Sequence, residues 1–255
     1  IVGFITIYSV LPSFIKFAHD QDIVTNPSIH KHPAMLLTEP SARGGGVVYG
    51  LVFVLLAIVF VGFPANLIPF YLGIVLLSIV GFLDDYQNTH PETKWRFMEN
   101  PFIRLLLLFL IVLLVSVLGR DAYSISYMLG RMFESPLNII SIGITTIWIG
   151  WVLNVLSWSN GIDGQYGGIV AIASFMLIML ALRFPDLTIE HRRVAILAAI
   201  SAGLSLGFIR FTWHPSKVLW GFGAMNAGLV LAVLSIMISS KIATSVLIIL
   251  IPFLD

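Results

Sequence analysis

The chain of 255 residues is 58% hydrophobic and 11% charged, with a mean hydropathy of +0.98. Soluble domains carry about 25% charged residues, and a soluble globule of this composition would expose too much apolar surface. The composition therefore indicates a polytopic membrane protein. A formal net charge of +1 gives no sign of a nucleic-acid partner, and the lack of cysteine excludes disulfides and thiolate metal sites.

Apolar segments follow one another along most of the chain. A membrane-spanning helix needs about 20 mostly apolar residues, and the sequence predicts an all-α fold, a polytopic transmembrane helical bundle with about nine spans. We expect a single domain over residues 1–255, truncated at both ends, because the chain starts at Ile1 inside one apolar run and stops near another. The nine segments are 1–18, 44–63, 67–83, 102–119, 137–155, 167–183, 194–210, 220–238 and 241–255.

The loops between these segments differ in their polar residues. Short links at 63–66 and 239–241 predict tight hairpins. If successive spans alternate in direction, loops 19–43, 84–101, 156–166 and 211–219 share one side of the membrane. That side holds nine of the 13 acidic residues, five of the six histidines and eight of the 14 Lys and Arg residues. An excess of Lys and Arg favours the cytoplasmic side, so we expect these four loops to form a cytoplasmic active face with a shared cleft.

A glycine run opens the second segment. Arg43 precedes Gly44, Gly45 and Gly46. Glycines at a helix start let backbone N–H groups approach an anion closely, and Arg43 would add a positive charge. The alternative interpretation is a flexible entry into a membrane span.

Two adjacent carboxylates, Asp84 and Asp85, follow the third segment. A charge at the bilayer centre costs about 2.5–3.5 kcal/mol, so we expect the pair in water at the mouth of the span. There it could hold a divalent cation, which could in turn hold a diphosphate, with Lys94 near the phosphates. The alternative is an interfacial charge cluster that anchors two helices.

Polar residues recur every three positions after the fifth segment, at Asn154, Ser157, Asn160 and Asp163. On a helix this spacing places them along one face, where they could bind a ligand or, for Asp163, a cation. The alternative is a helix end followed by a turn. In loop 211–219, Lys217 could contact a phosphate.

These pieces, in this order and between these spans, resemble the polyprenyl-phosphate N-acetylhexosamine-1-phosphate transferases, glycosyltransferase family 4, over about residues 40–255. Each piece alone is common, but the set is specific. The matching pieces are Gly44-Gly45, Gly81 to Tyr86 with Lys94, Asn154 to Gly164, Pro215 to Gly221, and Pro252 to Asp255.

The resemblance implies an enzyme that moves a sugar-1-phosphate from a UDP-sugar to polyprenyl (undecaprenyl) phosphate and releases UMP. It implies magnesium, with manganese as the alternative, and an integral protein of the plasma membrane that has ten spans when complete. A homodimer is one assembly that it leaves open. The implied residues are Asp84 and Asp85 for catalysis, Asp84, Asp85 and Asp163 for the metal, and Gly44, Gly45, Lys94, Asn154, Asn160, Asp163 and Lys217 for substrates.

Three positions depart from the family pattern. Ser157 replaces an asparagine, Asn160 replaces an aspartate, and Phe222 stands where the family has an aspartate associated with magnesium. Since Phe222 cannot ligate a metal, either the remaining aspartates suffice, or metal use has changed, or activity has been lost. The alternatives to a transferase are an altered homologue that binds polyprenyl phosphate or nucleotide sugar without transfer, and a polytopic transporter.

Overall fold

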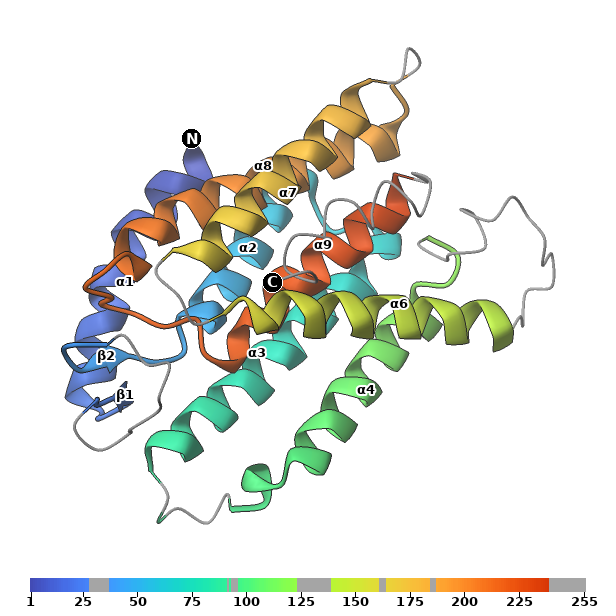
Figure 1. Cartoon of the computed structure of the whole chain (residues 1–255). Helices are drawn as coiled ribbons and strands as arrows, with labels where there is room; N and C mark the ends of the chain where they lie inside the picture. Colours follow the sequence, from blue (N-terminus) through green and yellow to red (C-terminus); the bar gives the residue numbers. More distant parts are fainter. Residues whose placement is uncertain are drawn as a thin grey trace.

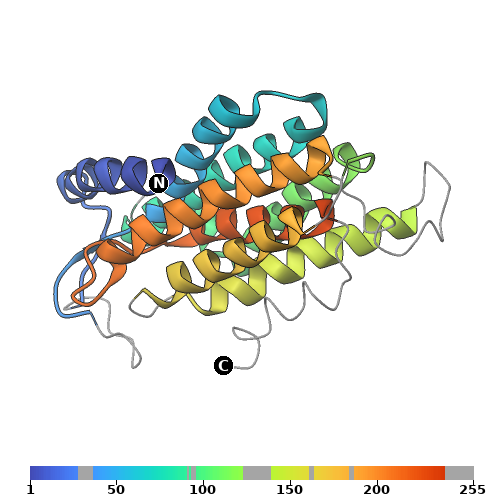
Figure 2. The same ribbon diagram turned by 90° about the horizontal axis from the view of Figure 1, so that it is seen from above.

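The computed structural model describes residues 1–27, 37–90, 92, 96–122, 139–160, 164–183 and 187–238. Lys94, Asp163 and the predicted segment 241–255 lie outside these ranges. The described parts form a bundle of helices (Figures 1 and 2). The α-helices are α1 (Val2–Asp20), α2 (Gly45–Val61), α3 (Ile68–Thr89), α4 (Pro101–Leu118), α6 (Ile139–Trp158), α7 (Gln165–Leu182), α8 (Ile189–Thr212) and α9 (Met225–Met237).

The predicted all-α membrane bundle is confirmed, but the count of nine spans is not. Six helices of the described chain are long and apolar enough to cross a membrane, which indicates a multi-pass membrane protein. Two predicted spans contain shorter helices, since α2 has 17 residues and α9 has 13. The link at 63–66 is short and enters the 3-10 helix Ala65–Leu67, whereas the link at 239–241 lies outside the described ranges.

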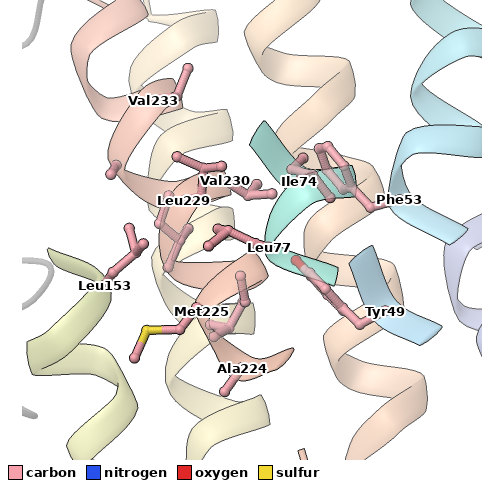
Figure 3. Close-up of a cluster of buried hydrophobic side chains, with 14 of the residues drawn as sticks. Tyr49, Phe53, Ile74, Leu77, Leu153, Ala224, Met225, Leu229, Val230 and Val233 are labelled. Atoms are coloured by element: carbon pink, nitrogen blue, oxygen red, sulfur yellow. The ribbon is translucent and has the colours of Figure 1, made fainter. Parts of the chain in front are cut away.

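Helix α9 forms the centre of the bundle. Every residue from Met225 to Met237 is buried, and α9 contacts α2, α3, α6, α7 and α8. Leu229, Val230 and Val233 of α9 pack among side chains of α2 and α3 (Figure 3). A helix that is hydrophobic on all sides is stable where protein or lipid surrounds it, and the contacts of α9 show that protein surrounds this one. The outer helices instead expose large apolar side chains, such as Leu105 and Phe109 of α4, as expected for a surface in contact with lipid.

The third helix is longer than predicted, and this changes the setting of the acidic pair. The sequence placed the end of the span at Leu83, whereas α3 continues to Thr89. Asp84 and Asp85 therefore lie inside the helix and not in the loop that follows it. The apolar run ends at Leu83, but a helix ends only where its hydrogen bonds end, and polar residues such as Gln87 and Asn88 extend it.

One end of the bundle gathers the segments between the helices. The strands β1 (Val24–Thr25) and β2 (Ser41–Ala42) form a small antiparallel pair. Ala42 also bridges Val218, through hydrogen bonds from Ala42 N–H to Lys217 O (3.1 Å) and from Leu219 N–H to Ala42 O (2.8 Å). This bridge holds the chain before α2 against the chain before α9, at the end of the bundle where α3 finishes and α4 begins (Figure 1).

Candidate functional site

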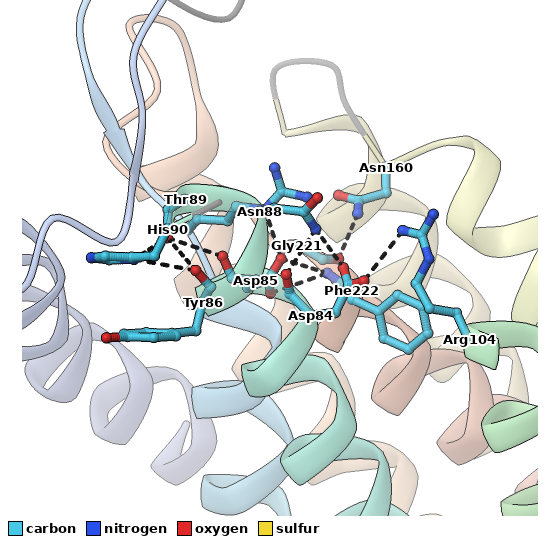
Figure 4. Close-up of polar contacts among 11 residues, drawn as sticks. Asp84, Asp85, Tyr86, Asn88, Thr89, His90, Arg104, Asn160, Gly221 and Phe222 are labelled. Carbon is cyan, nitrogen blue, oxygen red and sulfur yellow. Dashed lines mark hydrogen bonds and ion pairs between the residues drawn. The ribbon is translucent and has the colours of Figure 1, made fainter. Parts of the chain in front are cut away.

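The acidic pair of α3 is buried. Asp84 is 2% exposed and Asp85 is 0% exposed, so the expectation that both face water is wrong. Burying an ionised carboxylate is costly unless it is paired and hydrogen-bonded. Neighbouring elements supply both kinds of partner, and the contacts of the pair define the candidate site (Figure 4).

Asp85 joins three elements. Its Oδ1 accepts a hydrogen bond from Nε of Arg43 at 2.7 Å, which is also an ion pair. Its two oxygens share the backbone N–H of Phe222, at 3.2 and 3.1 Å. The residue before Phe222 is Gly221, with φ of +64°, and a Cβ there would collide with both carboxylate oxygens. Asp85 therefore holds Arg43 and the turn before α9 against α3.

Asp84 faces the next helix along the chain. Its Oδ1 accepts a hydrogen bond from Nη1 of Arg104, in the first turn of α4, at 3.2 Å. Its Oδ2 accepts one from Nδ2 of Asn88 at 2.9 Å. Arg104 is the one charged residue in the sequence of α4, and it lies in the first turn, at the end of the span that follows the acidic pair. That position was the signal in the sequence that could have identified it as a partner of the acidic pair.

The polar residues that the sequence predicted to share one face of a helix, in and after α6, make different contacts. Nδ2 of Asn154 donates to Gly150 O at 2.7 Å, and Oγ of Ser157 donates to Asn154 O at 2.8 Å, so both bond within their own helix. Nδ2 of Asn160 donates to Gly221 O at 3.0 Å and so reaches the turn that Asp85 holds. Asp163, the fourth residue of the predicted set, lies outside the described ranges.

The glycine run at the start of α2 packs closely against the turn before α9. The N–H groups of Gly45 and Gly46, which we expected to meet an anion, donate to Leu219 O and Trp220 O at 2.9 Å each. A Cβ at Gly46 would collide with backbone atoms of Gly223 and Ala224. The described contacts therefore favour a packing role for this run. Gly44 lies beside Asp85, with φ of +94°.

Contacts between described parts confirm that the four loops meet at one end of the bundle, whereas the shared cleft stays a prediction. Arg43 meets Asp85, the Ala42 bridge reaches Val218, and Asn160 meets Gly221, which follows loop 211–219. Loop 211–219 is shorter than expected, because α8 continues to Thr212. Lys217 is exposed in this loop, and Lys94 lies outside the described ranges.

Asn226 in the core, a polar residue that no sequence motif identified, also supports this arrangement. Nδ2 of Asn226, on α9, donates to Gly46 O at 3.1 Å and to Ser78 Oγ at 2.9 Å. Asn226 and Ser78 are both buried. The side-chain amide of Asn226 thus links α9 to α2 and α3. Because Asn226 is only four residues after Phe222, it also helps to hold the turn before α9 against α3.

The described residues alone do not complete a magnesium site. Magnesium prefers near-octahedral oxygen coordination, and the carboxylates of Asp84 and Asp85 supply at most part of such a set, with all four of their oxygens also accepting hydrogen bonds from protein donors. Phe222 supplies no ligand atom. Across the described ranges, no three His, Asp or Glu residues gather in a way that could hold a metal. A contribution from Asp163 stays a prediction.

Comparisons with known proteins place this geometry in a family context. The model of glycosyl transferase family 4 matches residues 67–239, which includes Asp84, Asp85, Arg104, Asn160 and Phe222. The match covers more than half of the chain.

Curated relatives match over nearly the whole chain. A probable undecaprenyl-phosphate N-acetylglucosaminyl 1-phosphate transferase of Bacillus subtilis is 24% identical over 93% of this chain and 61% of its own length. Phospho-N-acetylmuramoyl-pentapeptide-transferases of Caldicellulosiruptor bescii and Streptococcus uberis are 22% and 28% identical, over 97% and 89% of this chain. The chain spans 76% and 68% of the length of these two proteins.

Proposed function

Since this chain belongs to glycosyl transferase family 4, we propose that it transfers an N-acetylhexosamine-1-phosphate from a UDP-sugar to polyprenyl phosphate, in the synthesis of cell-wall or surface-glycan precursors. The names of the relatives support undecaprenyl phosphate as the acceptor. The observation that carries the proposal is the junction of Arg43, Asp85, Phe222 and Asn160, four parts of the chain that meet at one end of a membrane bundle.

The reaction joins two phosphates. An oxygen of the lipid phosphate attacks the β-phosphorus of the UDP-sugar, and a new P–O bond forms. The bond from that phosphorus to the oxygen that bridges the two phosphates breaks, and UMP leaves with the electron pair. The products are polyprenyl-diphosphate-sugar and UMP. Because two anions must meet, the site has to neutralise charge and align them.

The residues of the described site suit this task. Arg43 and Arg104 provide guanidinium donors for phosphate oxygens, and Asp85 and Asp84 hold these side chains in place. Asn160 stands at the turn that Asp85 fixes. Contacts of the substrates with Gly44, Gly45, Lys94, Asn154, Asp163 and Lys217 remain predictions from the sequence.

The proposed setting is the plasma membrane, with the acidic pair at the cytoplasmic end of the bundle. This orientation rests on the excess of Lys and Arg on that side of the sequence. It also suits the substrates, because a nucleotide sugar is soluble in water whereas the tail of a polyprenyl phosphate stays in lipid.

The test is transfer by the protein in nanodiscs that contain undecaprenyl phosphate. UDP-N-acetylglucosamine and UDP-N-acetylmuramoyl-pentapeptide are supplied separately, and UMP and the lipid product are measured. We expect release of UMP and lipid product in equal amounts, and a loss of at least about 100-fold in Arg104→Gln, the scale for removal of a positioned charge. Arg120→Gln is the matched control.

Arg120 suits this purpose because it follows the far end of α4, where it pairs with exposed Asp121. The two arginines lie 16 residues apart, which is about 24 Å along a helix. Binding of both substrates without transfer would instead indicate the altered homologue, the candidate that Phe222 favours. Absence of both binding and transfer would contradict the proposed function.

A further inference from the structure

The charged groups of the site differ in how much of each is exposed. The side chains of Arg43 and Arg104 are 28% and 32% exposed, whereas those of their partners Asp85 and Asp84 are 0% and 3% exposed. The cluster therefore presents its cationic side outward and keeps its anionic side inside the bundle.

Each arginine keeps donors beyond the one that its aspartate uses. A guanidinium carries five N–H donors in a rigid fork that matches phosphate oxygens. In the described contacts, Asp85 takes Nε of Arg43 and Asp84 takes Nη1 of Arg104. The carboxylates thus fix the orientation of both forks without occupying all of their donors.

The arrangement also determines which ions can approach. Asp84 and Asp85 are adjacent in α3 and each is paired with one arginine, so two carboxylates and two guanidinium groups, whose formal charges cancel, form one cluster. A divalent cation that arrives from water meets the guanidinium groups first and is repelled. An anion that arrives by the same route meets N–H donors. The exposed side of the cluster therefore favours anions over cations.

We propose that Arg43 and Arg104 form a phosphate-binding pair that takes the place of a divalent cation, so that this protein binds its phosphate ligands without magnesium. The pair suits a terminal phosphate or a diphosphate, which a nucleoside diphosphate sugar or a polyprenyl phosphate headgroup could supply. The inference rests on the proposed function and specifies how that site handles charge. In this arrangement the side chain of Phe222 does not have to supply a metal ligand. Its backbone N–H donates to Asp85, and Asp85 in turn holds Arg43.

The test measures binding by the full chain in nanodiscs, with either EDTA or magnesium present. In one arm, radiolabelled UDP-N-acetylglucosamine is titrated onto nanodiscs that lack undecaprenyl phosphate. In the other, nanodiscs with and without undecaprenyl phosphate are compared by thermal stability of the protein. The two arms distinguish the nucleotide from the lipid as the source of the phosphate. The variants are Arg43→Gln, Arg104→Gln, the charge-preserving Arg104→Lys, and Arg120→Gln as control.

We expect the Kd of the nucleotide sugar to agree within about twofold in EDTA and in magnesium, or the thermal stabilisation by undecaprenyl phosphate to be the same in both buffers. Arg43→Gln and Arg104→Gln should each weaken that binding by at least about tenfold, the scale for a lost hydrogen bond to a charged group. Arg104→Lys should recover only part of it, because lysine lacks the fork, and Arg120→Gln should match wild type. If Arg43→Gln does not fold, Arg104→Gln carries the test, since Asp84 keeps Asn88 as a partner.

Two results would overturn the inference and leave the proposed function standing. One is binding that requires magnesium, and the other is unchanged binding in a folded Arg104→Gln variant. Failure to bind either ligand in both buffers, together with absence of transfer, would overturn the inference and the proposed function together.

Discussion

Phe222 donates its backbone N–H to both carboxylate oxygens of Asp85, at 3.2 and 3.1 Å, although 137 residues separate the two positions. The backbone of this residue thus holds the turn before α9 onto α3, while its ring is packed against the core. The family resemblance places an aspartate at this position. The substitution leaves the backbone contact available and removes a carboxylate from the neighbourhood of Asp84 and Asp85.

Phe222→Asp should make the protein respond to magnesium. A third carboxylate beside two buried ones adds repulsion, which a hard cation with oxygen ligands relieves. We expect the variant to unfold at a lower temperature than wild type in EDTA and to regain stability as magnesium is added, whereas wild type should not respond. Thermal unfolding in detergent measures both effects.

Phe222→Asn is the matched control for this change, because it removes the ring but adds no charge. It should be destabilised without a response to magnesium. Equal stabilisation of wild type and Phe222→Asp by magnesium would show that wild type already binds the cation, and would contradict the expectation.

Replacing one member of the Arg43–Asp85 pair should cost more than replacing both. Arg43→Met leaves a fully buried carboxylate with only a backbone N–H, and removal of one partner of a buried ion pair costs about 3–5 kcal/mol. Adding Asp85→Asn removes the uncompensated charge and should restore part of the loss. A double-mutant cycle of unfolding free energies measures the coupling. Additive effects would contradict the pairing.

The burial of Asp85 can also be tested with a single variant. If the aspartates faced water, as the sequence predicted, Asp85→Asn would leave the stability of the fold unchanged. Because Asp85 is buried and holds two other elements, we now expect a measurable loss of stability, of about 1–3 kcal/mol for a buried hydrogen-bonding group that loses its charged partner.

Gly46→Ala should separate α2 from the turn before α9. The new Cβ would collide with backbone atoms of Gly223 and Ala224, which cannot move as freely as a side chain. Overpacking of this kind costs about 1–3 kcal/mol. The control is Gly168→Ala in the first turn of α7, where a Cβ would have no neighbour within 4 Å. Unfolding temperatures should fall for Gly46→Ala and stay level or rise for Gly168→Ala; the same change in both would contradict the close packing.

Asn160→Asp should impair the protein, although it restores the residue type of the family pattern. The side-chain amide donates to Gly221 O, and an aspartate would place an acceptor against that acceptor and lose the hydrogen bond. We expect transfer to fall about tenfold or more. Ser159→Ala is the control, since Ser159 bonds only to Leu156 O of its own helix among the described contacts. Faster transfer by Asn160→Asp would show that the family role of this position outweighs the contact with Gly221.

The sequence was sufficient for the class of fold and for the positions of most helices. Hydrophobic runs identify apolar helices because the bilayer requires about 20 apolar residues, and the sorting of acids by loop correctly indicated which segments meet. Hydrophobic runs could not show where a helix ends when its last residues are polar. They ended one helix at Leu83, and so placed Asp84 and Asp85 in water when both lie in a buried turn of α3.

The contacts of the site were less predictable, because they join residues far apart in the chain. Arg43 was identified as a possible anion ligand, but its pairing with Asp85 depends on how α2 meets α3. The donation of Phe222 N–H involves a backbone group, which no residue pattern reveals. Asn226 looked like one polar residue in an apolar run, and its role depends on the backbone of Gly46, 180 residues away.

The hydrogen bond between Phe222 and Asp85 also sets an order of events during biosynthesis. Chains grow at roughly 5–20 residues per second, so the turn before α9 is made about 7–27 seconds after Asp85. Until then, the carboxylate lacks one of its donors and α3 lacks the central helix that covers it. A nascent chain released before this point would carry an exposed polar defect at the end of its third helix, a feature that membrane quality control could recognise. The last described helix thus contributes to both the core and the charged site.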